Sequence, residues 1–279
     1  MDGIIIQRID FNTLDHSKIN NNNLPKDSLD YEAMAKNYSD EVVKTHLNTY
    51  YKLVNYPVKF EYEFTEDEIN ILKESAKVSI ITAKRNSLME DELMTIENRL
   101  KNNWIDGKYF IRFDSGSPKD GYPKFPLMSA ANVIDIIITS HRAFKAMNND
   151  NKKIYFVEFN ESWESSHEVR VFVRKGKVTC ISQYNPYNAA FFNEMTDLNL
   201  KHITQNIISK VNQLVKLLCD NIKTYDFVVD LYIEDDYGAK LIELNSFGYW
   251  LSSGSALFNW NDDRTKLYGD GNIYFRILI

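Results

Sequence analysis

The chain has 279 residues, of which 44% are hydrophobic and 13% aromatic, a composition that supports a folded core and excludes a wholly disordered chain. Its 33 basic and 39 acidic side chains give a net charge of −6, so there is no overall basic surface for nonspecific nucleic-acid binding. The only cysteines, Cys180 and Cys219, exclude a disulfide scaffold and are typical of a reducing compartment.

The first half of the chain predicts helices around one strand. Residues 12–65 are polar and rich in asparagine, with a helix or helical pair expected over 31–54. Further helices are expected over 64–77, 89–104 and 130–147, and the first of these carries a capping box of Thr65 and Glu68. A strand at 108–113 then leads into the loop DSGSPKDGYPKFP, residues 114–126.

The second half predicts strands in pairs. KIYFVEF (153–159) indicates a strand, and HEVRVFVRKGKVTCISQYN (167–185) indicates two strands joined by a tight turn at Lys175–Gly176. Apolar residues recur with the helical period over 203–223. DFVVDLYI (226–233) and KLIELN (240–245) predict a second hairpin around a polar turn.

Several classes of protein are disfavoured. No segment approaches the roughly 18 apolar residues of a membrane helix, and the N-terminal MDGIIIQRIDF lacks the pattern of a signal peptide. The five histidines show no metal-binding spacing, and no GxSxG motif occurs, which argues against an acyl-enzyme hydrolase. We therefore expect a cytoplasmic protein with no membrane association, and nucleic acid is an unlikely ligand.

Two carboxylates interrupt the apolar strands of the second hairpin. Glu243 and Asn245 share one side of their strand, where burial is costly unless something pairs with them. If Ile233 lies opposite Lys240, Asp230 lies opposite Glu243, and facing carboxylates repel each other unless a cation lies between them. These three oxygen ligands then predict a Mg²⁺ site that shares its shell with phosphates. A register shift of one residue would remove the pairing, and the alternative is an exposed strand edge.

Basic residues suited to phosphate precede this hairpin. Arg112 interrupts the strand 108–113, and the loop that follows joins small residues, including Ser117, to Lys119. Arg170 lies on the strand EVRVFVR, and arginine suits bidentate phosphate contacts, although a solvated strand face is the alternative. The loop has neither the GKS/T ending of a P-loop nor the GxGxxG spacing, so it is weak by itself.

In their order and spacing, these motifs resemble the cell division cycle protein 123 family, which has the ATP-grasp superfold. The resemblance covers about residues 56–260 and rests on YFIRFDSGSPKDG, on EVRVFVRKGKVTCISQYN, and on FVVDLYI followed by KLIELNSFG. It implies an α+β, ATP-grasp-like fold in which two α+β lobes with antiparallel sheets clamp a nucleotide. The expected parts are a partly helical N-terminal extension (1–65), a first lobe (66–155) and a second lobe with the metal site (156–279).

The resemblance also implies roles for individual residues. Asp230, Glu243 and Asn245 match the family's metal-binding positions. The strand around Phe156–Phe159 would offer backbone groups to adenine, and ATP and Mg²⁺ are the implied cofactors. The full set expected to bind nucleotide is Arg112, Ser117, Lys119, Phe156, Val157, Glu158, Phe159 and Arg170; no catalytic residue is assigned.

Members of this family are ATP-dependent assembly factors that bind the gamma subunit of translation initiation factor 2, and this is the leading hypothesis for the present chain. Three positions depart from the family pattern: Arg112 replaces lysine, Glu243 replaces aspartate and Ser246 replaces proline. Arginine retains the charge for phosphate but removes an amine nucleophile, and glutamate lengthens the metal ligand by one carbon.

Two other functions remain open. One is an ATP-grasp ligase or phosphoryl-transfer enzyme that acts on a small carboxylate or a nucleic acid, because metal and arginine electrostatics suit phosphoryl transfer equally well. The other is a non-catalytic binding module whose acidic strand face is exposed. Acid-stimulated turnover of ATP would favour the first, and failure to bind ATP with Mg²⁺ would favour the second.

Overall fold

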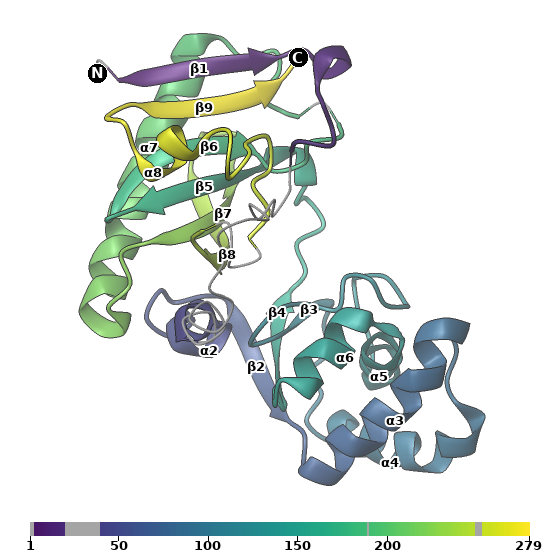
Figure 1. The fold of residues 1–279 in the computed structure, drawn as a ribbon. Coiled ribbons are helices and arrows are strands. Elements are labelled where there is room, and N and C mark those ends of the chain that lie inside the picture. Colours follow the sequence, from purple (N-terminus) through teal and green to yellow (C-terminus); the bar gives the residue numbers. More distant parts are fainter. Residues whose placement is uncertain (1–2, 20–39, 189, 249–252) are drawn as a thin grey trace. The chain divides into compact units, whose positions relative to one another are not determined.

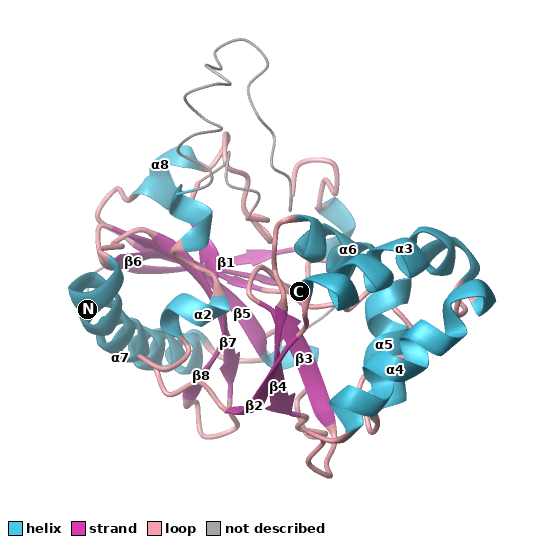
Figure 2. Cartoon of the chain, turned by 90° about the horizontal axis from the view of Figure 1, so that it is seen from below, coloured by secondary structure: helices cyan, strands magenta, loops and turns pink. Residues whose placement is uncertain are grey.

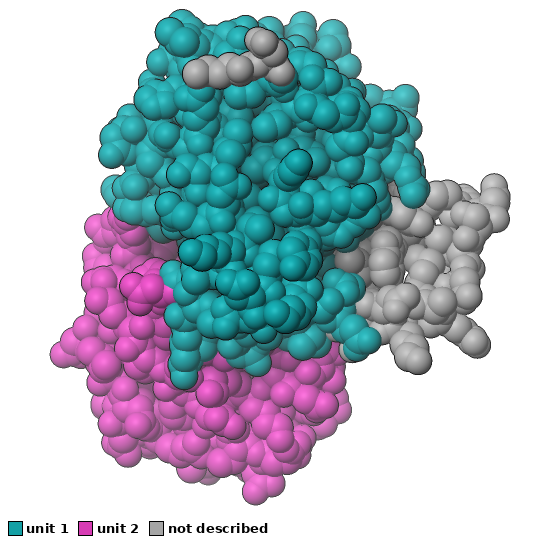
Figure 3. Space-filling model, turned by 90° about the vertical axis from the view of Figure 1, so that its left-hand side faces the viewer, with its two compact units in different colours: residues 1–54, 162–279 teal, residues 55–161 magenta. Residues whose placement is uncertain are grey.

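The structure is a computed structural model that describes residues 3–19, 40–188, 190–248 and 253–279. The chain forms two compact units, residues 1–54 with 162–279 (unit 1) and residues 55–161 (unit 2), which Figure 3 shows in different colours. The units divide the chain at 54/55 and 161/162, whereas the lobe boundaries expected from the sequence lie at 65/66 and 155/156. Those lobe boundaries stay a prediction, and each unit is described by itself.

Unit 1 contains a six-stranded mixed sheet (Figure 1). The two hairpins expected from the sequence are confirmed, and they form the four adjacent strands at one side of the sheet. At its other side β9 pairs in parallel with both β1 and β6, a long-range pairing that the sequence analysis did not predict. In sheet order the strands are β1 (Ile4–Ile9), β9 (Ile273–Leu278), β6 (Lys177–Gln183), β5 (Glu168–Arg174), β7 (Phe227–Ile233) and β8 (Ala239–Ser246).

The long helix α7 (Asp197–Ile222) packs against this sheet and contacts β1, β6 and β8. It starts six residues before the expected 203 because Thr196 caps it, accepting a hydrogen bond from the backbone N–H of Asn199. Its buried apolar stripe, at the spacing that the sequence predicted, includes Leu200, Ile203, Ile207, Val211, Leu214 and Leu218.

A second apolar cluster of unit 1 packs strand residues such as Phe172 and Val228 against Phe258 and Trp260 from the segment after β8. Because Phe172 and Val228 lie at even positions on β5 and β7, they share a sheet face with Arg170 and Asp230. This face is therefore covered in part by the chain itself. The short elements of unit 1 are η1 (Phe11–Thr13), α2 (Leu47–Tyr50), η3 (Ser165–His167) and α8 (Arg264–Tyr268).

The helix or helical pair expected over 31–54 lies partly outside the described residues. Residues 40–43 are helical and Leu47–Tyr50 form α2, whereas residues 31–39 are not described. Within the described ranges, no helix is both long and apolar enough to cross a membrane.

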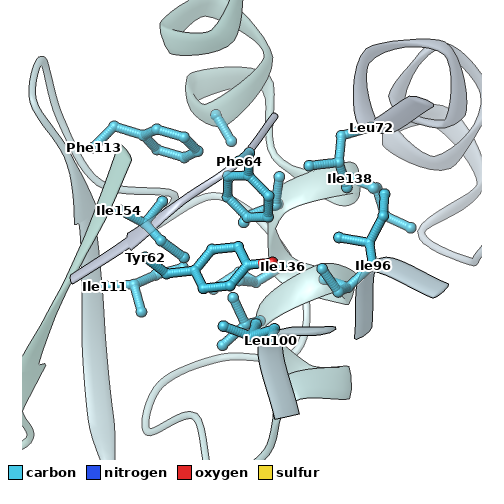
Figure 4. Close-up of a cluster of buried hydrophobic side chains, with 14 of the residues drawn as sticks. Tyr62, Phe64, Leu72, Ile96, Leu100, Ile111, Phe113, Ile136, Ile138 and Ile154 are labelled. Carbon is cyan, nitrogen blue, oxygen red and sulfur yellow. The ribbon is translucent and has the colours of Figure 1, made fainter. Parts of the chain in front are cut away.

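Unit 2 is an antiparallel sheet of three strands with helices packed against one face (Figures 1 and 2). The central strand is β4 (Lys153–Glu158), between β2 (Val58–Glu63) and β3 (Tyr109–Phe113). Apolar side chains of these strands meet those of the helices in one core (Figure 4). The helical elements are α3 (Glu66–Thr82), η2 (Ser87–Met89), α4 (Glu90–Lys101), α5 (Ala130–Thr139) and α6 (His141–Asn148). The helices expected over 64–77 and 89–104 are thus confirmed as α3 and α4, and both capping-box hydrogen bonds of Thr65 and Glu68 are present.

The single helix expected over 130–147 is wrong, because Ser140 divides it into α5 and α6. Ser140 is extended (φ −101°, ψ 123°), and its hydroxyl accepts the backbone N–H of Ala143 and donates to Asp120. Gly121 approaches α5 so closely at this point that a β-carbon there would lie 2.4 Å from the carbonyl oxygen of Ile136. The loop after β3 therefore packs against the break between the two helices, and serine at 140 caps the new helix.

Candidate functional site

The second hairpin pairs Asp230 with Glu243 through a β-bulge. At the turn end of the hairpin, Ile233 lies opposite Ala239, so the expected pairing of Ile233 with Lys240 is wrong. The register shifts by one residue immediately after Asp230 along β7, and β8 accommodates the extra residue. This shift brings Asp230 directly opposite Glu243, which confirms the expected pairing of the two carboxylates.

A row of polar side chains crosses the whole sheet of unit 1 at this level. Residues that lie opposite each other on neighbouring strands project from the same face of a sheet. The pairings of all six strands join into one continuous row, in the order Gln7, Arg276, Ser182, Arg170, Asp230 and Glu243. The sequence analysis identified the last three of these residues as candidates and did not identify the first three. Gln7 and Arg276 lie on the parallel strands β1 and β9, which it did not predict, and Ser182 lies on an expected strand but was not singled out.

Arg170 and Asp230 form a buried, bidentate ion pair. Arg170 Nε donates to Asp230 Oδ1 and Arg170 Nη2 to Asp230 Oδ2, both at 2.8 Å, and the two residues are only 8% and 2% exposed. Arg170 Nη1 also donates to the carbonyl of Gly254 at 2.7 Å, and the ring of Tyr184 lies 5.0 Å from the guanidinium. Burial opposes the charged form of Arg170, but the charge of Asp230 and the hydrogen bonds to it raise the pKa of the guanidinium above its ordinary value. The pair is therefore a buried contact in which Arg170 keeps its positive charge.

Asn245 lies on the same face of β8 as Glu243, and its Nδ2 donates to Asp230 Oδ2 at 3.1 Å. Each carboxylate oxygen accepts about two hydrogen bonds, so Asp230 retains capacity mainly at Oδ1. The amide of Asn245 presents its remaining oxygen as an acceptor, and the carboxylate of Glu243 is half-buried.

These residues fit a hard divalent cation, because carboxylate and amide oxygens are ligands of Mg²⁺. Within the described ranges, no group of three or more His, Cys, Asp or Glu side chains is placed to hold a metal, so the site depends on two carboxylates and one amide. Its acidic part is also partly neutralised by Arg170, which donates to both oxygens of Asp230.

A small pocket lies beside the ion pair in unit 1. It has a volume of about 240 Å³, and Arg170 forms part of its wall. The ring of Tyr187 stacks on His16, with 5.6 Å between ring centroids. The lining residues are Ser165, Arg170, Tyr184, Asn185, Pro186 and Tyr187. Arg170 therefore contacts Asp230 and also lines this pocket.

Three of the residues expected to contact phosphate lie on β3 and its following loop in unit 2. Arg112 is 3% exposed and lies opposite Tyr155 on β4. Ser117 is 2% exposed, and its hydroxyl has no hydrogen-bond partner among the described residues. Lys119 is exposed, with Nζ 5.8 Å from the ring of Phe110. A buried hydroxyl and a buried arginine beside an exposed lysine are consistent with an anion site, and this role remains a prediction.

The residues expected to contact adenine occupy the central strand of unit 2 and the position after it. Phe156 is fully buried and stacks on Phe60, with 4.0 Å between ring centroids. Val157 and Phe156 have a neighbouring strand on each side, so sheet pairing occupies their backbone. Glu158 forms an ion pair with Lys59, and Phe159 donates its backbone N–H to Lys108. After Val157 the pairing with β2 ends, whereas Glu158 still pairs with Tyr109 of β3, and contact with adenine stays a prediction.

The comparisons with known proteins agree with this architecture. The D123 family model matches residues 140–278, whereas no curated protein sequence matches the chain. C-terminally truncated Cdc123 from Schizosaccharomyces pombe superposes with a TM-score of 0.60 and 17% identity, covering 86% of this chain and 97% of that chain. Cdc123 from the same organism gives a TM-score of 0.59 and 19% identity, covering 85% and 96%. A RimK domain ATP-grasp protein from Sphaerobacter thermophilus is more distant, with a TM-score of 0.32, 12% identity and coverage of 72% and 58%.

The chain is therefore a mixed α+β protein with antiparallel strand pairs, as the sequence predicted, and its fold is similar to that of Cdc123 from Schizosaccharomyces pombe. The family match over residues 140–278 includes the ion pair, the pocket and both hairpins of unit 1. The resemblance of the motifs to this family is thus confirmed by the D123 match over residues 140–278 and by the structural similarity to Cdc123.

Proposed function

We propose that this chain binds ATP together with Mg²⁺ and acts as an assembly factor for translation initiation factor 2 through the gamma subunit of that factor. The observation that carries the nucleotide part is the pairing of Asp230 with Glu243 across β7 and β8, with Asn245 on the same face. Two carboxylates that face each other on neighbouring strands, together with the amide of Asn245, form a set of oxygen ligands that suits a divalent cation. The assembly role is carried over from the family resemblance.

In this proposal, the residues of each unit have separate tasks. Glu243, Asn245 and the remaining capacity of Asp230 hold Mg²⁺ in unit 1. Arg112 and Lys119 contact phosphate oxygens in unit 2, with the buried hydroxyl of Ser117 as a further donor. When bound, Mg²⁺ supplies positive charge that neutralises the phosphate oxygens. Arg112 keeps its proton at all accessible pH values and thus serves as a fixed charge for phosphate rather than as a nucleophile.

The first test is thermal unfolding with ATP, with and without Mg²⁺. Ligand at about 100 times its Kd stabilises a protein by about 2.7 kcal/mol, which is a shift of several degrees at this size. Glu243→Gln should abolish the Mg²⁺-dependent shift, because it removes one of the two facing carboxylates while leaving the hydrogen bonds between Arg170 and Asp230 intact. Asp235→Asn is the matched control: it removes the same charge from the exposed turn of the same hairpin and should retain the shift.

The second test concerns the partner. The purified gamma subunit of translation initiation factor 2 is titrated against the wild-type chain and Glu243→Gln, with ATP and Mg²⁺ present. Binding that weakens in Glu243→Gln but not in Asp235→Asn supports a nucleotide-dependent assembly role. Binding of ATP without binding of the subunit would restrict the proposal to its nucleotide part, and ATP turnover that requires a small carboxylate would replace the assembly role with that of a ligase.

A further inference from the structure

The polar row of unit 1 holds the segment after β8 against the sheet. Arg170 donates to the carbonyl of Gly254 at 2.7 Å. Ser182, the next residue of the row, accepts the backbone N–H of Leu257 at 3.0 Å, and Arg276 donates to the carbonyl of Leu257, also at 3.0 Å. Backbone groups of one segment are thus bound by three consecutive side chains of the row.

Two arginines of this row make closely matching contacts. Arg276 donates to both oxygens of Asp263 at 2.7 and 2.8 Å, to a backbone carbonyl, and lies 4.0 Å from the ring of Phe258. Arg170 likewise combines a bidentate carboxylate, a backbone carbonyl and an aromatic ring. The two differ in their carboxylate, because Asp230 faces the candidate cation site and Asp263 belongs to the covering segment.

Arg170 is poorly placed to leave its partner for a phosphate. Both oxygens of Asp230 depend on it, and Asp230 is 2% exposed, so departure of the guanidinium would leave a buried carboxylate charge without its cation. A phosphate would also meet a guanidinium whose charge is already balanced by Asp230. The contacts that fix Arg170 therefore favour a structural link over a direct contact with nucleotide.

We propose that Arg170 is a positioning residue, which orients the Asp230 carboxylate toward the cation site and couples it to the backbone of Gly254. This inference rests on the proposed binding of ATP and Mg²⁺. It assigns Arg170 a role through Asp230, in place of the direct phosphate contact expected from the sequence. Because the guanidinium of Arg170 binds both Asp230 and the carbonyl of Gly254, it links the geometry of the proposed cation site to that of the segment 253–257.

The test compares Arg170→Lys with Arg276→Lys in the full chain. Lysine retains the charge but loses the bidentate geometry. Arg170→Lys should raise the Mg²⁺ concentration that half-saturates ATP binding by about tenfold, as expected for the loss of a charge-assisted hydrogen bond. Arg276→Lys, which disturbs contacts to Asp263, Gln7 and the same segment but none to Asp230, should change this concentration by less than about twofold. The affinity for ATP in the absence of Mg²⁺ should be unchanged in both.

A double-mutant cycle with Asp230→Asn gives an independent result. If Arg170 acts through Asp230, Arg170→Lys has no further effect on the Mg²⁺ requirement once Asp230 is Asn. Multiplicative effects of the two substitutions, or an equal loss of ATP affinity with and without Mg²⁺ in Arg170→Lys, would overturn the inference and indicate a direct phosphate contact. The Arg170→Lys measurement decides between the two even if Asp230→Asn does not fold.

A measurement without nucleotide separates this inference from the proposed function. Hydrogen exchange of the segment 253–257 should be faster in Arg170→Lys than in the wild type, because the bond to the carbonyl of Gly254 is lost. Unchanged hydrogen exchange in Arg170→Lys would contradict the proposed coupling between Arg170 and the segment 253–257. If the wild type binds no ATP with Mg²⁺, the proposed function fails, and accelerated exchange then supports only the link between Arg170 and the segment.

Discussion

Asp230→Asn should strongly destabilise unit 1, although it changes a single atom. The amide places an N–H₂ group against an N–H donor of Arg170, so one of two hydrogen bonds at 2.8 Å becomes a contact between two donors. The guanidinium, 8% exposed, is then a buried charge without its counter-charge. Removal of one partner from a buried pair costs about 3–5 kcal/mol, which lowers the Tm by about 6–20 °C for a unit of this size.

Differential scanning calorimetry without nucleotide or metal measures this effect. The comparison is Glu243→Gln, which removes the facing carboxylate from the next strand. Glu243 is half-buried, and its substitution should cost less than about 1 kcal/mol, as for a partly exposed charge. Equal losses of Tm in the two variants, or a loss below about 1 kcal/mol in Asp230→Asn, would refute the view that Asp230 is fixed mainly by Arg170.

Three further predictions concern packing, capping and ionisation. Gly121→Ala should destabilise unit 2 by about 2 kcal/mol or more in urea unfolding, because the added β-carbon would lie 2.4 Å from a backbone oxygen. The control is Gly116→Ala, where the nearest atom to the added β-carbon is 3.6 Å away, and this substitution should cost less than about 0.5 kcal/mol. Thr65→Ala removes the N-cap of α3 and should cost about 1 kcal/mol, with Thr82→Ala at the far end of the helix as the smaller control. Burial raises the pKa of Tyr184 to about 12, so only the unfolded state releases this proton between pH 10 and 12, and stability falls as the pH rises through that window. Tyr184→Phe should therefore show a shallower alkaline loss of stability than the wild type, and parallel curves would contradict the assignment.

The sequence predicted those parts of the fold that depend on local pattern. Thr65 with Glu68 fixed the start of α3, and the turn at Lys175–Gly176 fixed the first hairpin, where both residues have positive φ (51° and 72°). Ser140 shows the limit of local pattern: an apolar period continues through 130–147, but the loop after β3 packs against the break. Parallel pairing of β1 with β9 joins residues some 270 positions apart, and no local signal marks such a pair.

The pairing of Asp230 with Glu243 was predicted correctly, but for an incomplete reason. A hairpin of constant register from its turn would place Ile242 opposite Asp230, and the carboxylates would project from opposite faces. The bulge at Ile242 restores the pairing, and bulges of this kind redirect side chains near functional sites. Arg170 was recognised as a cation on the correct strand, but its pairing with Asp230 depends on the order of strands in the sheet, which the sequence pattern does not contain.

The same geometry explains how glutamate at position 243 suits this site. Because both Asp230 oxygens accept hydrogen bonds from Arg170 and one also accepts from Asn245, that carboxylate stays close to the sheet. In the proposed site, a cation would then be held mainly by residues of β8. The side chain of Glu243 is one carbon longer than that of aspartate, so its carboxylate can reach about 1.5 Å further from β8. In the proposed site, Arg170 would therefore orient the carboxylate of Asp230, and Glu243 would supply the second, longer carboxylate ligand from β8.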